Sequence, residues 1–167
     1  TTMEKRWVHN EITNREVIDE LTHQLTIDRS LAEILVSRGI TTFEEARHFF
    51  RPQIAHLHDP FLMKDMETAI NRIDVAIAEG QHILIYGDYD VDGTTAVALA
   101  YQFFHQFTKH IAYYIPDRHS EGYGISTQGI DYARENGFHL IIALDCGIRS
   151  NDKVAYANSL GIDFIIC

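Results

Sequence analysis

Residues 83–93 read Ile83-Leu84-Ile85-Tyr86-Gly87-Asp88-Tyr89-Asp90-Val91-Asp92-Gly93, so an apolar segment leads directly into three carboxylates within five residues. The apolar segment is typical of a buried strand. Residues two apart on an extended chain share a face, so we expect Asp88, Asp90 and Asp92 to converge if the strand continues through them. Carboxylates this close repel one another unless a cation offsets their charge. The stretch therefore predicts a site for Mg²⁺ or Mn²⁺ at the end of a strand.

An EF-hand calcium loop also begins Asp-x-Asp-x-Asp-Gly, but it requires a glutamate at its twelfth position. Counted from Asp88, that position is Leu99, and the residues before Asp88 have the pattern of a strand and not of an entering helix. Both observations exclude an EF-hand. The remaining structural alternative is a solvated turn that caps the next helix.

The sequence from residue 66 onward alternates helix and strand patterns. Apolar runs predict strands at 82–86, 111–115, 140–144 and 164–167, and helical spacing predicts helices at 66–79, 94–107, 127–136 and 152–160. Strands that are apolar throughout and separated by helices are typical of a parallel sheet with helices on both faces. We therefore predict an α/β fold whose sites gather at the carboxyl ends of the strands.

The beginning of the chain has a different pattern, which predicts a small helical N-terminal extension. Thr42 and Glu45 have the spacing of a capping box at the start of a helix over 43–50. An earlier short amphipathic helix, stopped by Gly39, is predicted from apolar residues at helical spacing: Leu31, Ile34 and Leu35. We predict two parts, a helical extension over 1–62 and the α/β domain over 63–167.

A fourth carboxylate, Asp145, follows the apolar strand predicted at 140–144. Because the carboxyl ends of parallel strands meet at one edge of a sheet, Asp145 is expected beside the first acidic cluster. There it could bridge two cations, with Asp90 and Asp92 each facing one of them. Two cations so held can stabilise an in-line displacement at phosphorus. Taken alone, Asp145 would be interpreted equally well as a turn or helix-capping residue.

Groups that could contact a phosphate lie beside the predicted metal site. Gly93 permits close backbone approach, and Thr94 and Thr95 are expected to begin a helix whose amides and dipole favour a phosphate oxygen. A polar loop follows the second predicted strand on the same edge. In this loop Arg118 could hold a phosphate or be solvated. Tyr123 could stack on a base or anchor the loop in an apolar pocket.

The composition sets the broad class of protein. The 167 residues are 46% hydrophobic, and no apolar run approaches the roughly 20 residues of a membrane span. We expect a cytoplasmic protein with no membrane association. The two cysteines, Cys146 and Cys167, lie at the ends of apolar runs and are expected to be reduced and buried. A net charge of −10 argues against non-specific adhesion to nucleic acid, although bound metal would neutralise part of it.

Together these motifs resemble the DHH phosphoesterase superfamily and, within it, the bacterial RecJ single-strand-specific exonucleases. Residues 83–95 are similar to the first motif of the family, and Leu144-Asp145-Cys146-Gly147-Ile148 is similar to the second. The resemblance implies that Asp90 and Asp92 bind metal and that Asp145 bridges two Mn²⁺ or Mg²⁺ ions. It also implies that Asp88 is a ligand or a supporting acid, and that Arg118 helps to hold DNA at its 5′ end.

The resemblance further implies a 5′-to-3′ exonuclease that hydrolyses single-stranded DNA in repair and recombination, with a single-strand-binding protein and a helicase as partners. The Asp-His-His motif that names the family would follow the strand predicted at 164–167 and is not among the 167 residues. We therefore expect the N-terminal part of a DHH domain, inactive by itself. Two other functions remain open. One is a phosphoesterase of the same superfamily acting on short oligonucleotides or cyclic dinucleotides, and the other is a non-catalytic regulatory α/β domain that holds a metal ion.

Overall fold

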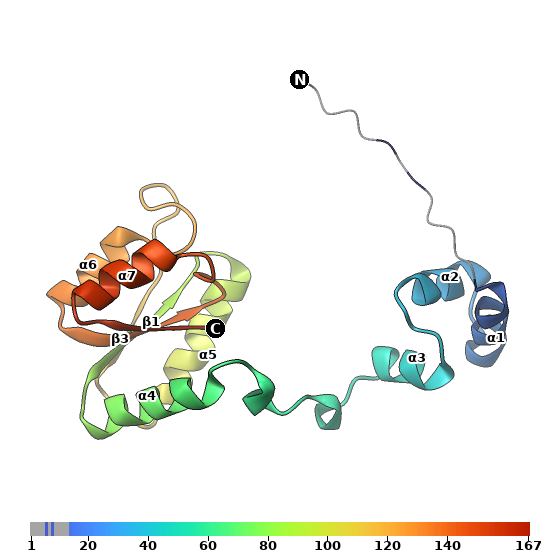
Figure 1. Ribbon diagram of the computed structural model, residues 1–167, viewed down its shortest axis with the longest axis horizontal. Helices are drawn as coiled ribbons and strands as arrows, with labels where there is room; N and C mark the ends of the chain where they lie inside the picture. The colour runs from blue at the N-terminus through green and yellow to red at the C-terminus, as the bar shows by residue number, and fades with distance from the viewer. Residues whose placement is uncertain (1–5, 7, 9–13) are drawn as a thin grey trace. The chain divides into compact units, whose positions relative to one another are not determined.

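The structure, a computed structural model, describes Arg6, Val8 and residues 14–167 (Figure 1). The chain divides into two compact units, one up to Asp59 and one from Pro60 to Cys167. The boundary expected from the sequence lies between residues 62 and 63. No helix among the described residues is both long enough and apolar enough to cross a membrane.

The described part of the first unit consists of short helices around a small core. The elements are α1 (Arg15–Leu25), α2 (Arg29–Ser37), α3 (Phe43–Phe50) and a 3₁₀ turn, η1 (Ile54–His56). The capping box of α3 is present, because the Thr42 hydroxyl accepts from the Glu45 amide and the Glu45 carboxylate accepts from the Thr42 amide. The sequence pattern does not single out α1. In α2, Ala32 is buried against α1 while Leu31 is 53% exposed, since the smaller residue allows the two helices to pack closely.

The second unit is built on a parallel sheet, which confirms the predicted fold class. Its strands are β1 (His82–Gly87), β2 (Ile111–Tyr114), β3 (Phe138–Leu144) and β4 (Asp163–Ile166). Their order across the sheet is β2-β1-β3-β4. β1 is therefore a central strand, and its residue Ile83 lies opposite Ile111 on one side and Leu140 on the other.

Helices cover both faces of this sheet (Figure 1). After the turn η2 (Pro60–Leu62), the helices of this unit are α4 (Met66–Ala78), α5 (Val91–Phe104), α6 (Thr127–Glu135) and α7 (Asn151–Ser159). α4 and α5 pack on the face that carries Ile83 and Ile85. α6 and α7 pack on the opposite face, which carries Leu84 and Tyr86. Because successive residues of β1 enter opposite cores, the strand is apolar throughout.

The junction between β1 and α5 differs from the sequence prediction. β1 ends at Gly87 and α5 begins at Val91, whereas the predicted helix begins at Thr94. The strand therefore does not continue through Asp88, Asp90 and Asp92, so the condition under which they would share one face is not met. Asp90 instead has an extended backbone and caps the helix, which ends the strand and starts α5 within a few residues.

The cysteines show a smaller difference. Both thiols are free, and Cys146 is buried as expected, but Cys167 is exposed. Cys167 follows the last residue of β4, and its amide donates to the Ala143 carbonyl of β3 at 2.9 Å.

Candidate functional site

The strand order reverses between β1 and β3. From β1 the chain moves to β2 on one side, then passes back to form β3 on the other side. In parallel α/β sheets such a switch point leaves a crevice beyond the carboxyl ends of the two strands, where ligands bind. Gly87 and Leu144 lie opposite each other at these ends. Asp88 and Asp145 are the next residues, so each strand delivers a carboxylate to the switch point.

Asp88 is the buried carboxylate of the site, with no exposed surface. Its Oδ1 accepts a hydrogen bond from the Tyr89 amide at 2.8 Å. Its Oδ2 is buried and has no hydrogen-bond partner among the described residues. A buried carboxylate oxygen without a partner is costly. Asp88 therefore keeps one oxygen available for a ligand beside the switch point.

Two glycines hold Asp88 against the first turn of α5. A Cβ on Gly93 would lie 2.4 Å from the backbone oxygen of Asp88 and 2.7 Å from its backbone nitrogen. A Cβ on Gly87 would lie 2.3 Å from the side chain of Val97. Gly93 was expected to permit close approach of a phosphate, and in the structure it permits close packing of α5 on the backbone of Asp88. Neither position has room for a larger residue.

Asp90 and Asp92 belong to the start of α5 and are both exposed. Asp90 is the N-cap residue, and its Oδ1 accepts from the Gly93 amide at 2.9 Å. Asp90 therefore caps a helix, which is the structural alternative to metal binding that the sequence left open. It leaves Oδ2 for another partner, because a carboxylate has two oxygens. Asp92 lies in the first turn, where the helix dipole favours negative charge.

The two threonines do not begin α5. The Thr94 hydroxyl donates to the backbone oxygen of Asp90 at 2.7 Å, as in the interior of a helix. Thr95 is exposed on the same turn. The predicted start is wrong by one turn because Asp90 supplies the cap. The Gly93 amide and the Thr94 hydroxyl are consequently engaged within the helix start.

Asp145 is exposed and has a left-handed backbone conformation, with φ of 57°. This conformation is uncommon outside glycine, and aspartate is among the residues that tolerate it best. Asp145 lines a hollow of about 530 Å³ at the ends of β3 and β4, together with Tyr123 and Arg149. Arg149 is not among the site residues predicted from the sequence. Its only sequence signal is that it follows the second acidic motif closely.

The same three carboxylates raise the pKa values of two neighbouring groups, the Tyr123 hydroxyl and the Cys146 thiol. The charge of Asp88, then burial, then the charges of Asp90 and Asp145 raise the pKa of the Tyr123 hydroxyl. Burial, followed by the same carboxylates, raises the pKa of the Cys146 thiol to about 11. The charges of Asp88, Asp90 and Asp145 therefore all act on Tyr123 and Cys146 at the carboxyl edge of the sheet.

The carboxylate oxygens at the carboxyl edge of the sheet are ligands that suit a divalent cation such as Mg²⁺ or Mn²⁺. The unpaired, buried Oδ2 of Asp88 is the observation that fits such a cation best. Among the described residues, no three His, Cys, Asp or Glu side chains are grouped closely enough to hold a metal ion by themselves. The set of ligands predicted from the sequence, Asp88, Asp90, Asp92 and Asp145, stays a prediction.

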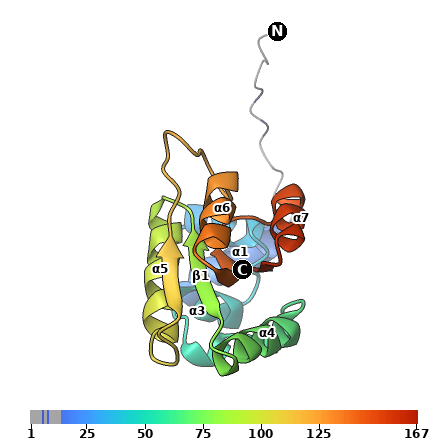
Figure 2. The ribbon, with the colours of Figure 1, turned by 90° about the vertical axis from the view of Figure 1, so that its left-hand side faces the viewer.

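The polar loop after β2 projects beyond the sheet as the orange segment of Figure 2. Glu121 orders it, because its carboxylate accepts from the Tyr114 hydroxyl at 2.9 Å and from the Asp117 amide at 2.8 Å. The buried Tyr86 hydroxyl donates to the Gly124 carbonyl and accepts from the Ser126 amide, each at 2.9 Å. The loop is therefore tied to the central strand.

Arg118 lies in this loop and reaches back toward the acidic segment. Its guanidinium carbon is 5.3 Å from the centre of the Tyr89 ring, a cation–π contact. The rings of Tyr89 and Tyr123 are 6.3 Å apart and nearly perpendicular. Tyr123 is 72% exposed, so it does not anchor the loop in an apolar pocket.

Tyr89 and Glu121 are not among the site residues predicted from the sequence. The only signal for Tyr89 is an aromatic residue between two acids, and Glu121 has none.

The chain is similar to curated single-stranded-DNA-specific exonucleases named RecJ. It is 40% identical over 153 residues to that of Bacillus subtilis (strain 168), covering 92% of this chain and 20% of the relative. It is 29% identical over 157 residues to that of Escherichia coli (strain K12), covering 93% of this chain and 26% of the relative. The chain thus spans about a fifth to a quarter of the length of these relatives.

Solved structures agree with the fold. A crystal structure of exonuclease RecJ bound to manganese matches with a TM-score of 0.57 and 27% identity, covering 62% of this chain and 27% of that chain. A crystal structure of RecJ from Thermus thermophilus in complex with Mn²⁺ matches with a TM-score of 0.64 and 21% identity over 91% of this chain and 20% of that chain. Residues 82–167 match the family described as the DHH family, N-terminal domain. This segment carries the whole sheet and both acidic motifs, and the chain therefore belongs to the DHH family.

Proposed function

We propose that this chain is part of a divalent-metal-dependent exonuclease that removes nucleotides from the 5′ end of single-stranded DNA in repair and recombination. One observation carries the proposal: Asp88 and Asp145 directly follow the paired strand ends Gly87 and Leu144 at the switch point of a parallel sheet, where Asp88 keeps a buried, unpaired oxygen. The similarity to exonucleases that are named for single-stranded DNA supports the substrate class.

Mn²⁺ or Mg²⁺ is the proposed cofactor, with two ions in the complete enzyme. Asp88, Asp90, Asp92 and Asp145 would hold them, and Asp145 would bridge the pair. Manganese in related crystal structures supports the choice of a divalent ion. When bound, the metal supplies positive charge that stabilises the phosphodiester oxygens during displacement. The protein contributes the fixed positions of the acids, through the helix cap at Asp90 and the close packing of Gly93 on Asp88.

The loop that carries Arg118 is the proposed contact for DNA. Arg118 would hold a phosphate near the 5′ end, and the cation–π contact with Tyr89 positions it beside the acidic segment. Tyr123 is exposed enough to stack on a base. We assign Gly93 and Thr94 to shaping the start of α5, because their polar groups are engaged there. Thr95 keeps the proposed phosphate contact.

Manganese titration of the 167-residue chain tests the site directly. We expect saturable Mn²⁺ binding, measured by electron paramagnetic resonance of the free ion, and its loss in Asp90→Asn and Asp145→Asn. Asp19→Asn is the matched control, because Asp19 pairs with Arg29 in the first unit. Equal binding by all four proteins would contradict the metal site.

Nuclease assays test the reaction. We propose that the 167 residues alone lack turnover, since the Asp-His-His motif is not among them. A chain extended through that motif is expected to release nucleotides from the 5′ end of single-stranded DNA when Mn²⁺ is present. A length series of oligonucleotides separates this activity from that of a phosphoesterase on short oligonucleotides or cyclic dinucleotides. Absence of cleavage at every length would favour a regulatory domain.

The remaining expectations are part of the same proposal. Removal of nucleotides from single strands requires that the strand be exposed, so a helicase and a single-strand-binding protein are the proposed partners. The cytoplasm is the proposed location, where chromosomal DNA of a bacterial cell would be reached. Co-sedimentation of the extended chain with purified single-strand-binding protein would test the first of these partnerships.

A further inference from the structure

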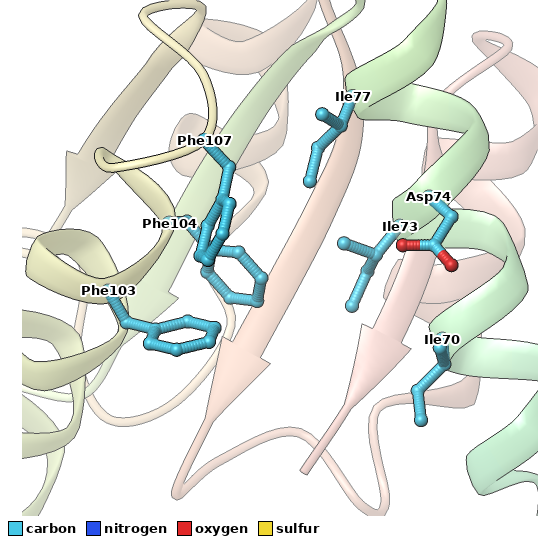
Figure 3. A pocket seen from close by; sticks show the side chains of 7 residues that line it. All are labelled: Ile70, Ile73, Asp74, Ile77, Phe103, Phe104 and Phe107. Atoms are coloured by element: carbon cyan, nitrogen blue, oxygen red, sulfur yellow. The ribbon is translucent and has the colours of Figure 1, made fainter.

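An apolar hollow lies between α4 and α5, away from the carboxylates of the proposed site. Its volume is about 310 Å³, and Figure 3 shows isoleucines of α4 facing phenylalanines of α5 and the turn that follows it. These residues are Ile70, Ile73, Ile77, Phe103, Phe104 and Phe107. Phe103 and Phe107 are 53% and 59% exposed although they line a concave surface. Large apolar side chains exposed together in a hollow are typical of a binding surface.

The apolar surface continues along α5. A second hollow, of about 410 Å³, is lined by Phe103 and Phe104 and extends to Leu99 and Ala96. Leu99 is 72% exposed. Leu99, Phe103 and Phe107 are spaced by four residues, so they form one stripe beside the residues with which α5 packs on the sheet. The helical part of the stripe, from Ala96 to Phe104, is about 12 Å long at 1.5 Å per residue, and Phe107 in the following turn extends it. The stripe therefore matches about two to three turns of a second helix.

A single carboxylate lines the groove. Asp74 projects from α4 beside Ile73 (Figure 3), is exposed, and makes no ion pair with any of the described residues. A carboxylate in an otherwise apolar groove favours a cation at that place. The protein carries a net charge of −10, which adds attraction for a basic partner. A second copy of this chain would bring the same net charge of −10, which opposes association.

We propose that the groove formed by α4 and α5 binds an amphipathic helix of a partner protein. Apolar side chains of the partner helix, spaced by three or four residues, fill the two hollows. A lysine or arginine at the edge of that helix pairs with Asp74. The second hollow extends to Leu144, the residue before Asp145, so the groove reaches the carboxyl edge of the sheet.

Fluorescence anisotropy of a labelled helical peptide tests this surface on the 167-residue chain. The probe is a 16-residue peptide with lysines on the flanks and leucines at positions 3, 6, 10 and 13, which span about 15 Å of helix. A second probe has glutamates in place of the lysines. We expect saturable binding of the lysine probe only. Asp74→Lys should weaken it about tenfold and allow the glutamate probe to bind. Phe103→Ser should weaken it about fivefold through loss of an exposed aromatic contact.

Glu135→Lys is the control, because it makes the same charge change on α6, on the opposite face of the sheet. Its affinity for the lysine probe should stay within about twofold of the unsubstituted chain. Equal weakening by Asp74→Lys and Glu135→Lys would overturn the proposal, since net charge alone would then explain binding. Sedimentation equilibrium provides a second readout. A dimer that Phe103→Ser dissociates would assign the groove to a second copy and would also overturn the proposal.

Discussion

The two edges of the sheet treat polar side chains in different ways. At the amino edge, Arg72 donates to Asp163 at 2.6 Å, and the ring nitrogens of His82 and His110 are 3.1 Å apart. At the carboxyl edge, the buried Oδ2 of Asp88 has no partner among the described residues. Arg72 also has one buried unpaired nitrogen, but its other contacts join α4 to the sheet. The buried Oε1 of Gln81, just before β1, is also unpaired. The edges therefore differ in that the unpaired atom at the carboxyl edge belongs to a carboxylate, which a divalent cation can bind.

The largest expected effect concerns the close packing that positions Asp88. Gly93→Ala would place a Cβ within 2.7 Å of two backbone atoms of Asp88, and backbone cannot move aside as a flexible side chain can. We expect the free energy of unfolding to fall by about 3 kcal/mol. Urea unfolding followed by circular dichroism measures this change.

Gly161→Ala is the control for that substitution. Gly161 has a φ of +78° and open space around it, so only the left-handed backbone is penalised, by about 1 kcal/mol. If Gly93→Ala cost no more than Gly161→Ala, the packing of α5 on Asp88 would not define the geometry of the carboxyl edge.

A second effect concerns the bond between the sheet and the Arg118 loop. Tyr86→Phe removes the hydroxyl that donates to Gly124 and accepts from Ser126. The loss of these buried hydrogen bonds should cost about 2 kcal/mol. Hydrogen exchange at residues 115–126 should accelerate along with it. Tyr113→Phe, at a side chain that is 58% exposed, should change neither quantity. Unchanged exchange in Tyr86→Phe would mean that Glu121 alone orders the loop.

A pair of aspartate substitutions compares the two edges directly. Asp88→Asn keeps the acceptor for the Tyr89 amide but removes a buried charge, so the metal-free chain should gain about 1 kcal/mol of stability. Asp163→Asn weakens the contact with Arg72 at the amino edge and should lose less than about 1 kcal/mol, because Asp163 is 60% exposed. Both are measured by urea unfolding in the presence of a chelator. A loss of stability in Asp88→Asn would show that its carboxylate supports the fold.

The sequence predicts the core of this molecule better than its edges. Apolar strands such as β1 and β3 follow from local pattern, because each buries both faces and so has little polar sequence. The start of α5 is mispredicted, since any of three closely spaced aspartates could cap the helix and in the structure Asp90 accepts from the Gly93 amide. The ties that order the loop join residues 38 and 40 positions apart. No local pattern encodes these contacts of Tyr86, whereas the bonds of Glu121 reach only four and seven residues back along the chain.

The last effect depends on pH and concerns Tyr114, whose hydroxyl bonds to Glu121 at the base of the loop. Burial, together with this carboxylate, raises the pKa of Tyr114 to about 12. Between about 10, the ordinary value for an unfolded chain, and about 12, the folded chain keeps a proton that the unfolded chain releases. Stability should therefore fall as the pH rises through this window. Tyr114→Phe should lose about 1 kcal/mol at pH 7, and its disadvantage relative to the unsubstituted chain should shrink above about pH 10. A disadvantage that stays constant up to the highest pH at which the fold survives would mean that the Tyr114 hydroxyl does not bond to Glu121, and that the carboxyl edge orders its loop through Tyr86 alone.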